Sequence, residues 1–198
     1  HHRPIEDFCS KTKNKKYKFL NIDLANESKT FEALRSVNPE IIFHLAAESH
    51  VDRSISKPFD FIKSNIIGTY NLLSASLNFY NHLKIEKRER FKFIHISTDE
   101  VFGSLGSNGY FSENSKYDPR SPYSASKASS DHLVKAWHHT YEFPAIVTNC
   151  SNNFGPRQFP EKLIPMVINK AISCKDIPMY GDGSNIRDWL FINDHIEA

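Results

Sequence analysis

Glycine is scarce in this sequence, and its few glycines do not form a phosphate-binding turn. Only seven of the 198 residues are glycine, and none precedes Gly68. Dinucleotide-binding folds normally open with a strand and a G-x-G-x-x-G turn, whose backbone approaches the pyrophosphate at a helix N-terminus. If the chain belongs to that fold class, we expect it to be a fragment that is truncated at this glycine-rich unit. The last residues, Asn193 to Ala198, read as the start of a helix.

Cysteine and long apolar runs are also scarce. The three cysteines, Cys9, Cys150 and Cys174, form no C-x-x-C pair and have no metal-site spacing with histidine, which favours reduced thiols in a cytoplasmic protein. No apolar run approaches the roughly 20 residues that a membrane helix needs, and the polar N-terminus does not resemble a signal peptide. We therefore expect a cytoplasmic protein that does not bind a membrane.

The charge balance gives no reason to expect a nucleic-acid partner. The formal net charge is +2, and the densest basic run, Lys11 to Lys18, is interpreted as a solvated loop. The hydrophobic fraction of 39% and the aromatic fraction of 13% are typical of a folded globular chain.

Apolar stretches that suit strands alternate with longer stretches of helical periodicity. This order predicts an α/β fold, a Rossmann-like doubly wound parallel sheet. Buried parallel strands read as nearly continuous apolar runs, as in residues 41–47. The expected strands are 17–24, 41–47, 91–97 and 145–150, and the expected helices are 28–37, 58–80, 122–141 and 161–173.

Polar residues follow each expected strand, where open α/β sheets bind their ligands. Asp23 closes the first, and Ala47–His50 follow the second. Thr98–Glu100 and Ser151–Asn153 follow the other two. The sequence therefore predicts a ligand site at the carboxyl edge of the sheet.

The spacing Tyr123-x-x-x-Lys127 places a phenol and an ammonium on one face of the predicted 122–141 helix. The ammonium is expected to lower the pKa of the phenol and to hold a nicotinamide ribose. Tyr123 is then able to take a proton from a substrate hydroxyl. By itself the spacing favours an exposed aromatic–lysine pair, but two features reverse this: Ser97 and Thr98 end the preceding strand and supply hydroxyls, and the surrounding string Pro119–Ser130 is distinctive.

Four segments resemble the dTDP-glucose 4,6-dehydratases, NAD-dependent nucleotide-sugar enzymes of the extended short-chain dehydrogenase/reductase type. The segments, in the order of that family, are His44–Ile55 (HLAAESHVDRSI), Ser97–Gly103 (STDEVFG), Asn149–Pro165 and Tyr180–Leu190. The likeness spans about residues 17 to 198. The chain departs from the family pattern in its absent glycine-rich start.

Two smaller departures are Phe102 and Phe154, which stand where this family commonly has tyrosine. The likeness implies a small nucleotide-sugar-binding domain whose beginning is residues 158–198, after a partial NAD-binding domain over residues 1–157.

The resemblance implies a three-step cycle at bound NAD. Tyr123, with Lys127, deprotonates the sugar C4 hydroxyl as C4 is oxidised, and Thr98 holds the C4 oxygen. Glu100 as base and Asp99 as acid then eliminate water across C5 and C6, and reduction at C6 gives a 4-keto-6-deoxy sugar nucleotide. A protonated Asp99 needs a raised pKa, which burial or the neighbouring Glu100 charge would supply. Without the resemblance, the acid pair is also compatible with a loop cap.

The resemblance also implies binding residues. Cofactor contacts are expected from Asp23, Leu24, Leu45, Ala46, Ala47, Glu48, Ser49, Ser64, Tyr123, Lys127 and Asn153. Substrate contacts are expected from Ser49, Thr98, Asn152, Lys162, Leu163, Pro178, Met179, Tyr180 and Arg187. The 58–80 helix and the Tyr123 helix resemble a dimer interface, so we expect a homodimer.

Other functions fit parts of the pattern. A nucleotide-sugar epimerase would keep Tyr123 and Lys127 without needing the acid pair, and a dehydratase of GDP-mannose or CDP-glucose would differ mainly in the base pocket. A truncated, inactive dinucleotide-fold module is a further alternative. His44 and His50 invite a metal interpretation, but no third ligand is suitably spaced, so we expect no metal.

Overall fold

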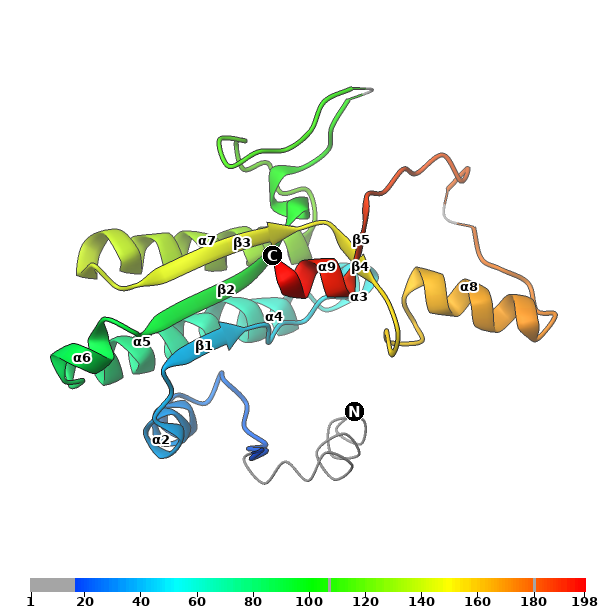
Figure 1. The fold of residues 1–198 in the computed structure, drawn as a ribbon. Helices are drawn as coiled ribbons and strands as arrows, with labels where there is room; N and C mark the ends of the chain where they lie inside the picture. The colour runs from blue at the N-terminus through cyan, green and yellow to red at the C-terminus, as the bar shows by residue number, and fades with distance from the viewer. Residues whose placement is uncertain (1–16, 107, 180) are drawn as a thin grey trace.

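The computed structural model describes residues 17–106, 108–179 and 181–198. Its centre is a parallel sheet in the order β1-β2-β3, which confirms the α/β, Rossmann-like class (Figure 1). Phe43 pairs with Ile94, and Ile94 pairs in turn with Ile146. The three strands are β1 (Ile41–His44), β2 (Lys92–Thr98) and β3 (Ala145–Cys150).

The predicted helices are confirmed with small shifts of their ends. The expected 58–80 helix is one continuous rod whose middle is π-helical. The helices among the described residues are α2 (Glu27–Val37), α3 (Val51–Ser56), α4 (Pro58–Phe61), the π-helix η1 (Ile62–Ile67), α5 (Gly68–Asn81), α6 (Ile85–Arg88), the 3-10 helix η2 (Asp99–Phe102), α7 (Pro122–Tyr141), α8 (Leu163–Ile172) and α9 (Ile192–Glu197).

Helix α7 begins where the sequence signals predict. The Ser121 hydroxyl accepts the Ser124 backbone N–H at 3.0 Å, and the Ser124 hydroxyl accepts the Ser121 N–H at 2.9 Å. This reciprocal capping box, followed by Pro122 in the first turn, fixes the helix start. The helix ends at Glu142, whose φ of 51° is left-handed. Tyr123 is thereby held in the first turn, beside the carboxyl edge of the sheet.

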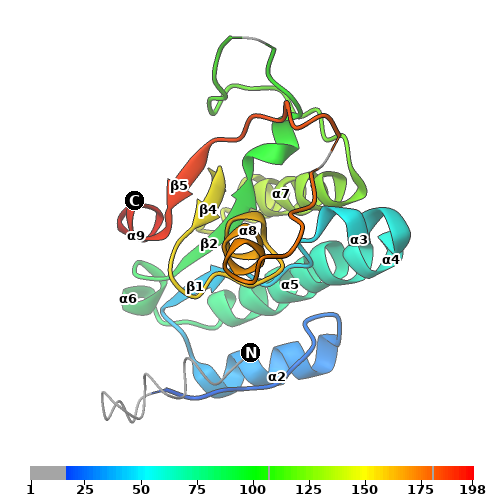
Figure 2. The ribbon, with the colours of Figure 1, turned by 90° about the vertical axis from the view of Figure 1, so that its right-hand side faces the viewer.

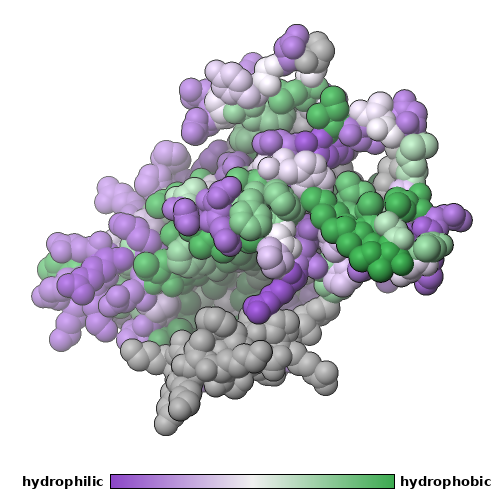
Figure 3. Space-filling model, turned by 45° about the vertical axis from the view of Figure 1, so that its right-hand side comes forward, coloured by the Kyte–Doolittle hydropathy of each residue, from purple (hydrophilic) through white to green (hydrophobic). Residues whose placement is uncertain are grey.

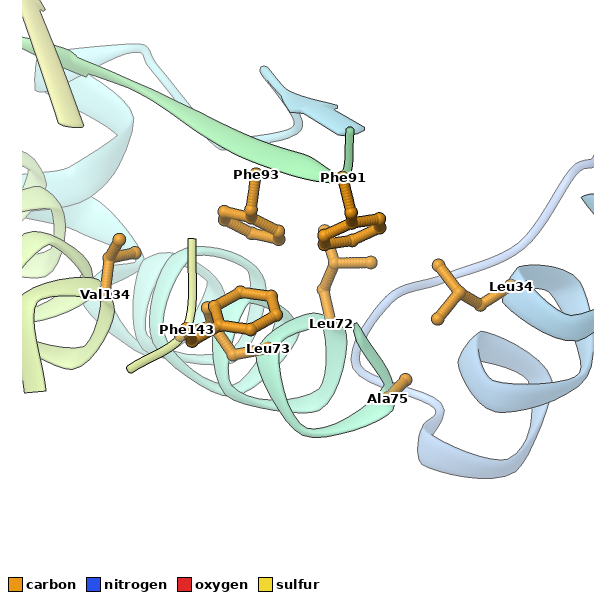
Figure 4. Packing of buried hydrophobic residues seen from close by; sticks show 8 residues of the cluster. All are labelled: Leu34, Leu72, Leu73, Ala75, Phe91, Phe93, Val134 and Phe143. Carbon is orange, nitrogen blue, oxygen red and sulfur yellow. The ribbon is translucent and has the colours of Figure 1, made fainter. Parts of the chain in front are cut away.

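The core lies between β2 and the helices α5 and α7, which cover one side of the sheet (Figures 1 and 2). Phe91, Phe93 and Phe143 are fully buried, and their rings meet at centroid distances of 5.7–5.9 Å. Leu73 from α5 and Val134 from α7 pack onto the same cluster (Figure 4). Burial of each large apolar side chain contributes about 1.5–3 kcal/mol, so this cluster fixes how the strands and helices meet.

The prediction of a strand over residues 17–24 is wrong, because the described residues 17–23 form no ladder with β1 or any other strand. Extended backbone becomes a strand only when its polar groups pair with a neighbour. The second expected strand is confirmed only over Ile41–His44, and it is not buried on both faces. It is the edge of the described sheet, and Phe43 and Leu45 are 60% and 65% exposed.

Two short strands, β4 (Asn152–Phe154) and β5 (Trp189–Phe191), form a second parallel sheet beyond β3. Between them α8 projects from the body, and Figure 3 shows a broad apolar area over it. Its Ile168 and Ile172 are 51% and 79% exposed. Within the described part of the chain, no helix is both long and apolar enough to cross a membrane.

Candidate active site

The carboxyl ends of β1, β2 and β3 lie at one edge of the sheet, as the arrows of Figure 1 show. Strand β2 ends at Thr98 and passes directly into η2, so Asp99 and Glu100 lie immediately beyond the strand. Helix α7 presents Tyr123 and Lys127 to the same region. The structure therefore brings together all five residues expected to be catalytic.

Thr98 organises the acid pair. Its hydroxyl donates to Oδ1 of Asp99 at 3.2 Å and accepts the backbone N–H of Glu100 at 3.2 Å, which caps η2. A hydroxyl that caps a short helix is held in a defined orientation. The Asp99 carboxyl and the Glu100 backbone are thus held at the end of the strand, and both residues remain partly accessible.

Burial raises the pKa of both carboxyl groups. The charge of Asp99 raises the pKa of Glu100 further, whereas Arg187 and Lys162 lower it. For Asp99, the Thr98 hydrogen bond opposes burial, and the like charge that raises its pKa is that of Asp188. The expectation that Glu100 supplies this like charge to Asp99 is therefore corrected: burial is the main cause that raises the pKa of Asp99, and the repulsion within the pair raises the pKa of Glu100 instead.

The pKa of the Tyr123 phenol is raised, not lowered as the sequence predicts. Burial is the main cause, the charges of Glu100 and Asp99 add to it, and a hydrogen bond with Thr98 opposes it. The ring packs edge-on against Phe61 at a centroid distance of 6.3 Å. Without a further positive charge at the site, the buried phenol stays protonated.

Lys127 is buried, and its ammonium donates to the backbone carbonyl of Ile96 at 2.8 Å. Burial lowers its pKa, and the charges of Asp131 and Cys150 raise it. The ammonium is therefore anchored on β2, and Lys127 is not among the groups that shift the pKa of Tyr123.

A cavity of about 280 Å³ lies beside the loop that leads into α2. Asp23 lines it and forms an ion pair with Lys63 at 3.0 Å. The neighbouring Leu24 packs against the core, and Ser64 follows Lys63 on the π-helix. Cofactor residues expected from separate segments are thus adjacent. The residues that line the cavity are Asn21, Ile22, Asp23, Ala25, Asn26, Lys29 and Lys63.

The loop after β1 is held by Asn65, a residue that sequence reasoning missed. The Asn65 amide accepts the Glu48 backbone N–H at 2.8 Å and donates to the Glu48 carbonyl at 3.0 Å. It also donates to the Ser126 hydroxyl at 2.8 Å, which in turn donates to the Tyr123 carbonyl at 2.7 Å. Asn65 therefore links the expected cofactor loop, Leu45–Ser49, to the Tyr123 helix. Its place in a π-helix, a frequent mark of functional sites, is visible only in the structure, so the sequence carried no signal for it.

Two expected substrate residues come together from distant segments. Lys162 donates to the backbone carbonyl of Ser49 at 3.2 Å and lies 3.4 Å from its hydroxyl. Next to it, Glu161 pairs with Arg53 at 2.6 Å. Arg187 is exposed, and its charge acts on Glu100. The segment before α8 is thus held against the segment after β1 by these contacts, and the charge of Lys162 acts on Glu100.

Asn153 has its side chain engaged within the protein. Its amide donates to Cys150 Sγ at 3.2 Å and to the Ser151 carbonyl at 3.1 Å, and its Oδ1 lies 2.7 Å from Nδ1 of His195. Asn152 stands beside it on β4. His195, which the sequence did not suggest, thereby connects α9 to the site.

The remaining expected substrate residues are less closely assembled. Leu163 starts α8, and Pro178 and Met179 are exposed in the segment between α8 and β5. Met179 is 71% exposed. Tyr180, like most of the Lys11–Lys18 run, lies outside the described residues.

His44 and His50 belong to no metal-binding group among the residues that the structure describes. His44 is buried and its Nε2 lies 2.8 Å from the Thr69 hydroxyl, while His50 precedes the first turn of α3. Among the described residues, no group of three histidine, cysteine, aspartate or glutamate side chains is arranged to hold a metal ion. Cys150 and Cys174 are free thiols.

Comparison with known proteins agrees with this geometry. A dTDP-glucose 4,6-dehydratase of Neisseria gonorrhoeae is 51% identical over 195 residues, covering 98% of this chain and 56% of the relative. The chain therefore spans about half the length of the curated relatives it matches.

Solved structures are similar over nearly the whole chain. The dTDP-glucose 4,6-dehydratase of Streptomyces venezuelae, crystallised with NAD bound, has a TM-score of 0.85 and 37% identity, covering 98% of this chain and 56% of that one. A UDP-glucuronic acid 4-epimerase of Bacillus cereus, in complex with UDP-glucuronic acid and NAD, has a TM-score of 0.81 and 31% identity, with coverages of 96% and 57%. The family model described as GDP-mannose 4,6 dehydratase matches residues 3–198, and the chain belongs to this family.

Proposed function

We propose that the protein to which this chain belongs is an NAD-dependent dTDP-glucose 4,6-dehydratase, a hydro-lyase. The observation that carries the proposal is the acid pair Asp99–Glu100, fixed by Thr98 in front of Tyr123. Elimination of water from a sugar needs a base and an acid on the same ring, and two adjacent carboxyl groups supply both. The relatives that bear this name at about half identity support the choice of sugar nucleotide.

The described residues fit NAD. Asp23 and Lys63 line a cavity that would take the adenine side of the cofactor, with Leu24 and Ser64 next to them in the chain, and Asn65 links the Leu45–Ser49 loop to the Tyr123 helix. Bound NAD would supply the hydride acceptor, the hydride donor and a positive charge. That charge would offset the burial that raises the pKa of Tyr123. The dehydratase of Streptomyces venezuelae, which was crystallised with NAD, supports the assignment.

The residues of the chain then have separate tasks. Tyr123 takes the proton of the C4 hydroxyl while Thr98 holds that oxygen. The ketone formed at C4 acidifies the C5 proton, which Glu100 removes. Asp99 gives its proton to the departing C6 hydroxyl, so one water leaves. Lys127, anchored on Ile96, holds the nicotinamide ribose.

The substrate side is formed by cations and by the segment before α8. Lys162, adjacent to Ser49, and Arg187 are the cations that act on Glu100, and a sugar nucleotide diphosphate is matched by such groups. With these, Asn152, Leu163, Pro178, Met179 and Tyr180 complete the proposed substrate contacts. Residues 158–198 would begin the nucleotide-sugar domain, and residues 1–157 would belong to the NAD-binding domain.

Incubation of the chain with NAD and dTDP-glucose tests this function directly. We expect the sugar nucleotide to lose one water, detected by mass spectrometry. An epimerase would instead give a product of unchanged mass that chromatography separates from the substrate. Unchanged substrate in the presence of folded protein that binds NAD by calorimetry would contradict dehydration by this chain.

We also propose a cytoplasmic homodimer that pairs through α4, α5 and α7. Phe59 of α4 and Tyr70 of α5 are 70% and 43% exposed. Tyr70 meets Trp137 of α7 edge-on at 6.0 Å, and Trp137 meets Tyr141 at 5.6 Å. Exposed aromatic side chains in one patch are typical of protein interfaces.

Light scattering of the chain at micromolar concentration is expected to give twice the monomer mass. Phe59→Glu is expected to give the monomer mass, because it places a charge in the interface. Ile85→Glu, on exposed α6, is the control and should stay dimeric. A monomeric unmodified chain would reject this interface for the chain.

A further inference from the structure

The seam between β2 and α7 contains a buried carboxylate with no role in the steps above. Asp131 lies on α7, one turn after Lys127, and its side chain is fully buried. Removing a carboxylate from water is costly unless charge and hydrogen bonds compensate for it. The contacts of Asp131 therefore indicate what the buried charge does.

Three side chains surround the Asp131 carboxylate. The hydroxyls of Ser97 and Tyr117 both donate to Oδ2, at 2.8 Å and 3.0 Å. Nε2 of His95 lies 3.1 Å from Oδ1. Burial lowers the pKa of His95, which favours the neutral ring. His95 and Ser97 belong to β2, so one carboxylate on α7 meets two alternate residues of the strand, through a hydrogen bond from Ser97 and a contact with His95.

Lys127 binds the residue between those two. Its ammonium donates to the carbonyl of Ile96 at 2.8 Å. Residues four apart on a helix share a face, so Lys127 and Asp131 together hold three consecutive residues of β2. These residues lead directly into Thr98. The distance between Tyr123 and the acid pair is therefore set at this seam.

The charge of Asp131 acts on the Lys127 ammonium. Burial, the larger effect, lowers the pKa of Lys127, and Asp131 opposes it. The only other acidic group that acts on Lys127 among the described residues is the Cys150 thiol, whose own pKa burial raises. Asp131 is thus the carboxylate that stabilises the charged form of Lys127.

We propose that Asp131 is a positioning residue of this active site, which fixes Lys127 and the end of β2 and thereby aligns Tyr123 with Thr98, Asp99 and Glu100. The proposal rests on the function proposed above. Asp131 does not touch the substrate, since it is fully buried and both donor hydroxyls occupy its Oδ2.

Asp131→Asn tests the electrostatic part, because it keeps the shape of the side chain and removes its charge. The titration of Lys127 is followed by NMR of the chain labelled in its lysines. We expect the pKa of Lys127 to fall below that of the unmodified chain. Asp60→Asn is the matched control, since it makes the same chemical change at an exposed position of α4. An unchanged Lys127 titration in folded Asp131→Asn overturns the proposal.

Ser97→Ala tests the positioning part and remains informative if Asp131→Asn does not fold. It removes the 2.8 Å bond between β2 and α7 and leaves the carboxylate charged. A hydrogen bond to a charged group is worth about 1.5–3 kcal/mol, so amide exchange of residues 98–100 is expected to become at least about tenfold faster. Unchanged exchange there overturns the proposal.

Neither measurement needs NAD or a sugar nucleotide, so the two proposals fail separately. If the chain lacks dehydratase activity but Lys127 titrates as expected, the proposal for Asp131 stands and the proposed function fails. If the chain is active but the pKa of Lys127 is the same with and without the Asp131 charge, the proposed function stands and this inference fails.

Discussion

Tyr123→Phe is expected to lower kcat for loss of water from dTDP-glucose by about 10²–10⁴-fold, the usual contribution of a positioned acid or base. The ring would keep its edge contact with Phe61, and only the hydroxyl that interacts with Thr98 would be lost. We therefore expect little change in stability or in the affinity for NAD. Steady-state kinetics by mass spectrometry, thermal melting and calorimetry measure the three quantities.

Tyr141→Phe is the matched control for this change. It removes the same atom from the other end of α7, where Tyr141 is half exposed and contacts Trp137. Its kcat should equal that of the unmodified chain. A Tyr123→Phe variant with full activity would show that another group removes the C4 hydroxyl proton, and the proposed roles of Thr98 and Lys127 would lose their basis.

Glu100→Gln is expected to stop the elimination while the first oxidation continues. Turnover should fall by about 10²–10⁴-fold, and reduced nicotinamide should accumulate, because C4 is oxidised but the C5 proton stays. Single-turnover absorbance of the nicotinamide separates the two steps. The exposed Glu113→Gln is the control with the same chemical change. If Glu100→Gln neither slows turnover nor lets reduced nicotinamide accumulate, Glu100 is not the base.

The pH profile follows from the same residue. A base must be ionised, so activity falls as the pH drops through the pKa of Glu100. Burial, the main cause, raises that pKa above the ordinary value of 4.5. The acid limb of kcat against pH is therefore expected above the range of an exposed glutamate, and it should be absent in Glu100→Gln.

The sequence predicted those parts of the fold that depend on local signals. The α7 boundaries follow from Ser121 and Pro122, and β3 follows from an apolar run. The convergence of Thr98 and Tyr123 follows from two general facts, the common carboxyl edge of parallel strands and the helical spacing to Lys127. Each of these features can be predicted either from neighbouring residues or from one rule of sheet topology.

The errors arose where a distant partner decides the outcome. Residues 17–23 look like a strand but have no ladder partner among the described residues. Asn65 and Asp131 carry no local signal, because their partners, Glu48 and Ser97, are 17 and 34 residues away. The raised pKa of Tyr123 reflects burial, which side-chain spacing alone does not reveal.

The π-helix η1 makes the length of this rod critical. A π turn accommodates one residue more than an α turn, and each α-helical residue advances by about 100° around the axis. Loss of a single residue within Ile62–Ile67 would therefore turn everything before it by about that angle relative to α5. Asn65 would lose its hydrogen bonds to Glu48, and Lys63, which lines the cavity, would rotate away from Asp23. At this point of the sequence, a one-residue deletion acts as a rotation of the site and not as a shortening of the helix.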